Sequence, residues 1–132
     1  MAHILLVEDE PDTRYALAQV LSSAGHEIVE AGSAADAAQL LAGADVDLLV
    51  CELQLSDGQA PGILDEARKR KPRLVVIAIC GGGLASSARH LEAARAAGVA
   101  AVLHKPFDSE TLVAVAEHLL GHGRRAAAGA SA

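Results

Sequence analysis

The chain has 132 residues, a formal net charge of −6 and a largely aliphatic apolar content, with Tyr15 and Phe107 as its only aromatic residues. This length suits one domain with its own core, and the negative charge argues against nucleic acid as the main partner. No apolar run reaches the roughly 18 residues that would cross a bilayer. Residues 1–4 lack the features of a secretory signal, so we expect a cytoplasmic protein without a membrane partner.

Five short apolar segments predict β-strands, at residues 4–7, 28–30, 48–52, 74–79 and 100–103. The first, third and fourth are continuously apolar, which is typical of parallel strands with helices on both faces. Between the strands, apolar residues recur at helical spacing and predict amphipathic helices, as in Leu17, Val20, Leu21 and Ala24.

Helix boundaries are marked by capping residues. Ser33 and Asp108 are suitable N-caps, and four glycines stand where helices are expected to end, namely Gly25, Gly43, Gly98 and Gly121. We therefore expect a domain over residues 1–121, followed by a flexible C-terminal tail at 122–132 that is rich in Ala and Gly.

The alternating order predicts an α/β fold, a (βα)5 doubly wound parallel sheet with the flavodoxin-like strand order 2-1-3-4-5. In such a sheet, ligands bind in a crevice at the carboxyl ends of strands 1 and 3. Three carboxylates follow or end these strands: Glu8, Asp9 and Glu52. Oxygen ligands of this kind suit Mg²⁺. The fifth strand adds Lys105 as a counter-charge, and the fourth ends at Cys80.

The three carboxylates and Lys105 lie in three motifs, namely Ile4-Leu5-Leu6-Val7-Glu8-Asp9-Glu10-Pro11, the segment 47–55 around Glu52, and Leu103-His104-Lys105-Pro106-Phe107. With this order and spacing, the chain resembles the CheY-like receiver domain of response regulators in bacterial two-component signalling, over about residues 3–120. The resemblance implies that Glu8 and Asp9 help to hold Mg²⁺. It also implies that the residue at position 52 accepts a phosphoryl group, which Lys105 contacts.

Several positions depart from the family pattern. Glu52 stands at the place of the phospho-acceptor Asp, Cys80 replaces a Ser or Thr, and Val102 replaces a switch aromatic. Ser56 replaces the Pro that usually stands four residues after the acceptor. The extra methylene of Glu52 moves its carboxylate by roughly 1.5 Å, and in-line phosphoryl transfer is sensitive to such misplacement.

The sequence therefore favours an atypical receiver that binds a protein partner without depending on Asp phosphorylation, with Glu52 as a partial phospho-mimic. Its expected partner is a histidine kinase, a phosphotransfer protein or a downstream effector. That partner, or a second copy, would dock on the face made by the fourth helix, fifth strand and fifth helix. Mg²⁺, held by Glu8, Asp9 and Glu52, is the implied cofactor, bound weakly or not at all.

Two alternatives remain open. The first is a phosphorelay receiver with a sluggish phosphate response, or a response to Mg²⁺ alone. The second is a metal-dependent phosphatase-type enzyme, against which the sequence offers no activated nucleophile or second base.

Three smaller features have competing interpretations. Asp57 is a substitute acceptor or, in better agreement with its Ser56-Asp57-Gly58 context, a turn residue. The basic run at 68–73 is a docking patch or a solvated helix end. Residues 81–83, all glycine, form an anion cradle or a hinge.

Overall fold

The computed structural model contains five parallel strands and five helices that alternate along the chain. It describes the backbone of residues 1–43, 45–57, 60–81 and 84–131, and their side chains except at 60–61, 84–87, 90 and 122–131. The strands are β1 (His3–Val7), β2 (Glu27–Ala31), β3 (Leu48–Glu52), β4 (Val75–Cys80) and β5 (Ala101–His104). The helices are α1 (Pro11–Ser23), α2 (Ala34–Gly43), α3 (Ala60–Arg70), α4 (Leu84–Ala96) and α5 (Ser109–Ser131).

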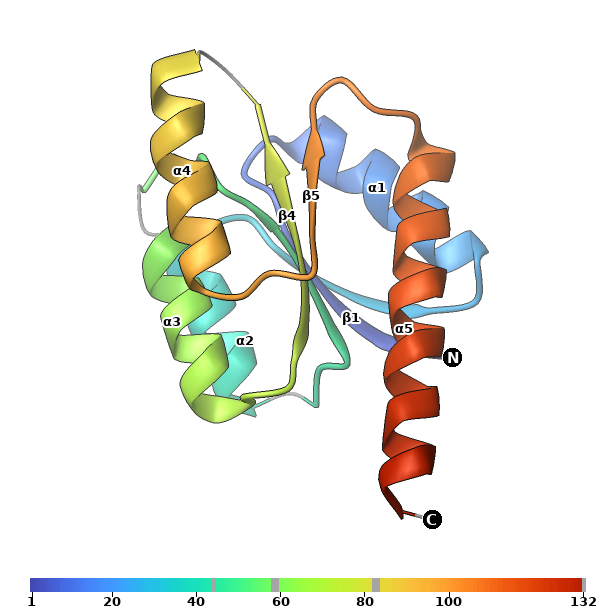
Figure 1. Cartoon of the computed structure of the whole chain (residues 1–132). Coiled ribbons are helices and arrows are strands. Elements are labelled where there is room, and N and C mark those ends of the chain that lie inside the picture. Colours follow the sequence, from blue (N-terminus) through green and yellow to red (C-terminus); the bar gives the residue numbers. More distant parts are fainter. Residues whose placement is uncertain (44, 58–59, 82–83, 132) are drawn as a thin grey trace.

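The sheet has the order β2-β1-β3-β4-β5, and all its pairings are parallel. This confirms the predicted fold and topology. Helices α2, α3 and α4 cover one face, and α1 and α5 cover the other (Figure 1). Among the described residues, no helix combines the length and apolarity needed to span a membrane.

Two hydrophobic clusters fill the spaces between the sheet and its helices. Because successive strand residues point to opposite faces, Leu5 and Val7 pack under α2, α3 and α4, in what we call the α2–α4 cluster. Ile4 and Leu6 pack under α1 and α5, in what we call the α1–α5 cluster. Every residue of β3 is buried, which explains its continuously apolar sequence. β5 is only half-buried, as expected for a strand at the sheet edge.

Most of the predicted helix boundaries are confirmed. Ser33 Oγ accepts a hydrogen bond from the Asp36 N–H at 3.1 Å. Gly25 and Gly98, which follow α1 and α4, have positive φ angles of 95° and 73°, a conformation that glycine adopts without a steric penalty.

The helix end predicted at Gly121 is wrong, because α5 continues through this residue to Ser131. Gly121 does not adopt a positive φ, and the alanines that follow have the highest helix propensity of any residue. The domain boundary at 121 and the flexibility of 122–132 stay predictions, since a helical backbone tests neither.

Within the basic run, Arg68 is an exception to the interpretation as a solvated helix end, whereas Lys69 and Arg70 are exposed as that interpretation predicts. The half-buried guanidinium of Arg68 donates to the carbonyls of Ala97 (2.8 Å), Gly98 (2.6 Å), Leu74 (2.5 Å) and Pro72 (3.2 Å). One side chain thus joins the end of α3, the α3–β4 loop and the turn after α4.

We predict that Arg68→Ala lowers the free energy of unfolding by about 2–3 kcal/mol, because several carbonyls lose their donor together. Urea denaturation measures the change. Lys69→Ala is the matched control, since Lys69 is exposed in the same helical turn, and it should change stability by less than about 0.5 kcal/mol. Equal losses in the two variants would contradict the assigned role of Arg68.

Candidate functional site

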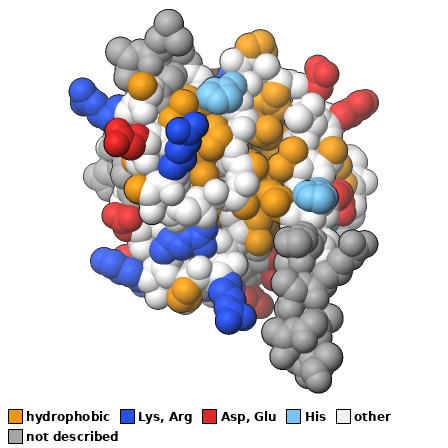
Figure 2. Space-filling model, in the orientation of Figure 1, with side chains coloured by type: hydrophobic (Ala, Val, Ile, Leu, Met, Phe, Trp, Pro, Cys, Tyr) orange, Lys and Arg blue, Asp and Glu red, His pale blue; other side chains and the backbone are white. Residues whose placement is uncertain are grey.

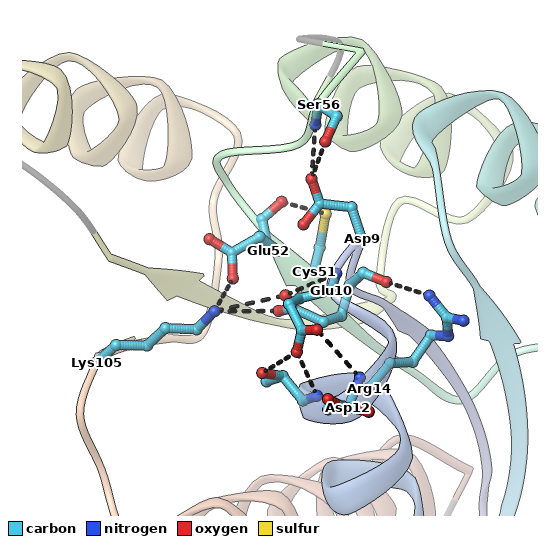
Figure 3. Close-up of polar contacts among 10 residues, drawn as sticks. Asp9, Glu10, Asp12, Arg14, Cys51, Glu52, Ser56 and Lys105 are labelled. Carbon is cyan, nitrogen blue, oxygen red and sulfur yellow. Dashed lines mark hydrogen bonds and ion pairs between the residues drawn. The ribbon is translucent and has the colours of Figure 1, made fainter.

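The carboxyl ends of β1, β3 and β5 bring together Glu8, Glu52 and Lys105. Lys105 Nζ lies 2.7 Å from Glu52 Oε2 and 3.3 Å from Glu8 Oε2. Both glutamates are buried, with relative exposures of 1% for Glu8 and 3% for Glu52. Lys105 reaches them from the β5–α5 loop (Figure 3). A single ammonium group therefore lies between two buried carboxylates.

The alternation of strand side chains explains this convergence. In β1 and β3, the residues two and four positions before Glu8 and Glu52 pack in the α1–α5 cluster, as do Ala101 and Leu103 before Lys105. Continuing the period of two places all three charged side chains on the same side of the sheet. By the same rule, Asp9 leaves β1 on the opposite side.

The Lys105 ammonium forms an ion pair with Glu52 Oε2, an atom that is buried within the protein. Burial opposes the charged form of Lys105, but its contacts with Glu52 and then Glu8 outweigh burial and raise the pKa of the ammonium.

The pKa of Glu8 is also raised, but here burial is a cause of the rise and does not oppose it. Burial is the largest cause that raises its pKa, and its hydrogen bond and charge repulsion with Glu52 add to the effect, so the pKa rises from 4.5 to about 7. Lys105 lowers this value only in part. The Glu8–Glu52–Lys105 group has two carboxyl groups and a single ammonium, so the raised pKa of Glu8 lets proton uptake there relieve part of the excess negative charge near neutral pH.

The absence of a side chain at Gly81 leaves room for the side chain of Lys105. A Cβ at residue 81 would lie 3.1 Å from Lys105 Cδ and 3.5 Å from its Cβ. The aliphatic part of Lys105 thus lies directly against the backbone of the β4–α4 loop. This contact gives Gly81 a packing role; residues 82 and 83 of the proposed anion cradle or hinge lie outside the described part of the chain.

The two predicted relay residues, Cys80 and Val102, lie on the other side of the sheet from the charged group. Cys80 is buried in the α2–α4 cluster, and Val102 is half-buried against the same cluster. Neighbouring Cys51 donates its thiol to the Glu52 carbonyl at 3.4 Å. Burial, followed by the charges of Glu52 and Glu8, raises the pKa of Cys51 to about 12, so it is an unreactive thiol.

Asp9 is separated from the other predicted metal ligands. Its Oδ2 accepts hydrogen bonds from the Ser56 N–H (2.8 Å) and from the Ser56 hydroxyl (Figure 3). Among the described residues, no three acidic, His or Cys side chains form a cluster that could hold a metal. Glu8, Asp9 and Glu52 are all described, and as they lie here they do not form a metal site that fits Mg²⁺. Their assignment as ligands of the ion stays a prediction.

Three contacts around the crevice were missed by sequence reasoning. Asp57 accepts hydrogen bonds from the Ala34 and Ala35 N–H groups at the start of α2, the nearest at 3.0 Å. Glu10 caps α1 by accepting from the Asp12 and Thr13 N–H groups. Arg14, which forms an ion pair with Glu30, donates a hydrogen bond to the Glu8 carbonyl at 2.9 Å. Only the Glu10-Pro11 pair carried a local signal, an acceptor before a proline at the first helical position.

Comparison with known proteins identifies the family. The response regulator receiver domain profile matches residues 4–117. The chain belongs to this family. The receiver domain is 36% identical over 121 residues to the response regulator protein FleR of Pseudomonas aeruginosa, covering 91% of this chain and 25% of FleR. It is also 31% identical over 121 residues to the sensor kinase CckA of Brucella abortus, covering 90% of this chain and 12% of CckA.

Solved structures agree with this assignment. The receiver domain of NtrX from Brucella abortus superposes with a TM-score of 0.78 at 33% identity, covering 89% of this chain and 98% of that one. A CheY-like receiver from Methanospirillum hungatei, at 22% identity, shares the fold with a TM-score of 0.88, covering 95% of this chain and 98% of that one. The chain spans only 12–25% of the first curated relatives. It is therefore a receiver, a signalling module of two-component systems.

We predict that the receiver loses stability as the pH rises from about 4.5 to 7. The folded state, with the raised Glu8 pKa, binds more protons than the unfolded state in this window, so the free energy of unfolding falls as pH rises. The fall should be on the order of 2 kcal/mol. Urea denaturation at several pH values measures it.

Glu8→Gln keeps the shape and a hydrogen-bond donor, and it should flatten this dependence. Glu92→Gln, at an exposed carboxylate of α4, is the matched control and should leave the slope as in the wild type. A wild-type slope that persists in Glu8→Gln would contradict the assignment to Glu8.

Proposed function

We propose that this receiver is an atypical one that acts as a protein-interaction module and does not depend on aspartyl phosphorylation. The observation that supports this most directly is the Glu52–Lys105 ion pair at 2.7 Å. The side chain at the acceptor position is already engaged by the cation that, in the family pattern, would contact an incoming phosphoryl group.

The proposed role of Glu52 is that of a constant, partial phospho-mimic. Its carboxylate carries one negative charge, whereas a phosphoryl group carries about 1.5 to 2. Because Lys105 neutralises much of this charge and Glu52 is only 3% exposed, the side chain would hold one conformation of the crevice. Protein level or partner supply would then control the output.

The substitutions at the relay positions fit the same proposal. The Cys80 thiol is a weak hydrogen-bond donor where a hydroxyl would grip phosphate oxygens, and it is buried among apolar residues. Val102 has no ring to swing inward and is stiff at χ1. Neither side chain is suited to carry a phosphate signal from the crevice to the surface.

The α4–β5–α5 face is the proposed docking surface. Figure 2 shows hydrophobic side chains gathered over β5 and along the adjoining side of α5. Half-buried apolar residues on these two elements are Val102, Leu103, Val113, Val115 and Leu119. A histidine kinase, a phosphotransfer protein, a downstream effector or a second copy of the receiver would bury this surface, and we propose that this occurs in the cytoplasm.

We predict that acetyl phosphate with Mg²⁺ leaves the mass of the wild-type receiver unchanged, because Glu52 is held by Lys105 and is displaced by about one bond length from the acceptor position. Intact-mass spectrometry measures the phosphorylated fraction. Glu52→Asp restores the acceptor side chain and should gain detectable acylphosphate. Stoichiometric acylphosphate on wild-type Glu52 would support the phosphorelay alternative instead.

We predict that Val113→Glu on α5 weakens partner capture at least about tenfold, because it places a charge within an apolar interface. Pull-down at graded bait concentration compares wild type, Glu52→Asp and Val113→Glu. Gln19→Glu adds the same charge on the exposed side of α1 and should bind as the wild type does. Circular dichroism confirms that each variant is folded. Unchanged capture by Val113→Glu would place the interface elsewhere.

A further inference from the structure

Ser56 ties the β3–α3 loop to the start of α1. Its N–H and its hydroxyl both donate to one oxygen of Asp9, Oδ2, a contact between residues 47 positions apart in the sequence. Figure 3 shows Asp9 turned toward Ser56, whereas Glu52 faces Lys105. Hydrogen bonds to a charged acceptor are stronger than those between neutral groups, so this pair holds the Asp9 carboxylate in a defined place.

The loop that carries Ser56 is anchored on both sides of it. Leu53 and Leu55 are buried in the α2–α4 cluster at 3% and 7% exposure. Asp57 accepts from the first N–H groups of α2, where a carboxylate also interacts favourably with the helix dipole. Ser56 is therefore held against Asp9 by its neighbours as well as by its own hydrogen bonds.

The residue type at position 56 decides whether this contact can form. Proline, which the family pattern has at this place, has neither a backbone N–H nor a hydroxyl. Both donors to Asp9 thus exist because this chain has serine at position 56. The buried carboxylates Glu8 and Glu52 have Lys105 as their cation, so each predicted metal ligand has a partner within the protein.

We propose that Ser56 and Lys105 form an internal latch that takes the place of the divalent cation and closes the crevice without Mg²⁺. A Mg²⁺ ion needs near-octahedral oxygen ligands. To obtain them it would have to free Asp9 from two hydrogen bonds and separate Lys105 from Glu52. This inference deepens the proposed function by making the closed crevice independent of metal as well as of phosphate.

The test is a titration of the full chain with MgCl₂, followed by NMR of backbone amides in the β1–α1 and β3–α3 loops, with NaCl at matched ionic strength as reference. The wild-type shift at Asp9 or Ser56 should stay well short of saturation over the titration, which sets the weak affinity to which the variants are compared. Ser56→Pro removes both donors and should bind Mg²⁺ about tenfold more tightly, and Ser56→Ala, which keeps the N–H, about threefold. Ser23→Ala, at an exposed serine of α1, should match the wild type.

Adding Asp9→Asn to Ser56→Pro should abolish the gain, because the released carboxylate is then absent. If Ser56→Pro does not fold, Ser56→Ala still decides the test. Saturable Mg²⁺ binding by the wild type, as tight as in the Ser56 variants, would overturn the latch. So would serine variants that bind Mg²⁺ no better than the wild type. Neither result bears on the pull-down experiment, so failure of the latch is distinguishable from failure of the proposed function.

Discussion

The Lys105 ammonium between Glu8 and Glu52 is the interaction on which the rest of the crevice depends. Two carboxylates removed from water at the end of a sheet are costly, since each loses its hydration and repels the other. One cation offsets this cost only in part, which is why Glu8 keeps a pKa near 7. Removing the cation would leave uncompensated buried charge, which is more damaging than never having placed the pair there.

The surrounding backbone is arranged to bring this cation to its place. Gly81 leaves room for the aliphatic part of Lys105, and the parallel pairing of β4 with β5 brings the β5–α5 loop to the same edge as β1 and β3. On the opposite side of the sheet, Ser56 and Asp57 hold the β3–α3 loop by contacts that do not involve Lys105. Two separate sets of polar contacts thus surround the crevice.

The atypical receiver that we propose would not act as a switch. A switch needs two states whose balance a ligand can shift by its differential affinity. In the proposed latch, the protein's own side chains would fill the positions at which a receiver crevice is expected to take a cation and a phosphoryl group. The surface that we propose for a partner is the apolar one over β5 and α5, which carries half-buried aliphatic side chains (Figure 2).

The sequence alone determined the strand positions, the topology and the family, because burial on both faces of a parallel sheet and the strand-end motifs leave local signals. The alternation of side chains along the strands also predicts that Glu8, Glu52 and Lys105 lie on one side of the sheet. Tertiary structure alone decided the pairing of Asp9 with Ser56, of Asp57 with α2 and of Arg68 with four carbonyls. These contacts join residues from 4 to 47 positions apart, and loop geometry, which has no sequence period, sets which donor meets which acceptor. The end of α5 was mistaken for a similar reason, since Gly121 stops a helix only where its φ turns positive, and here it does not.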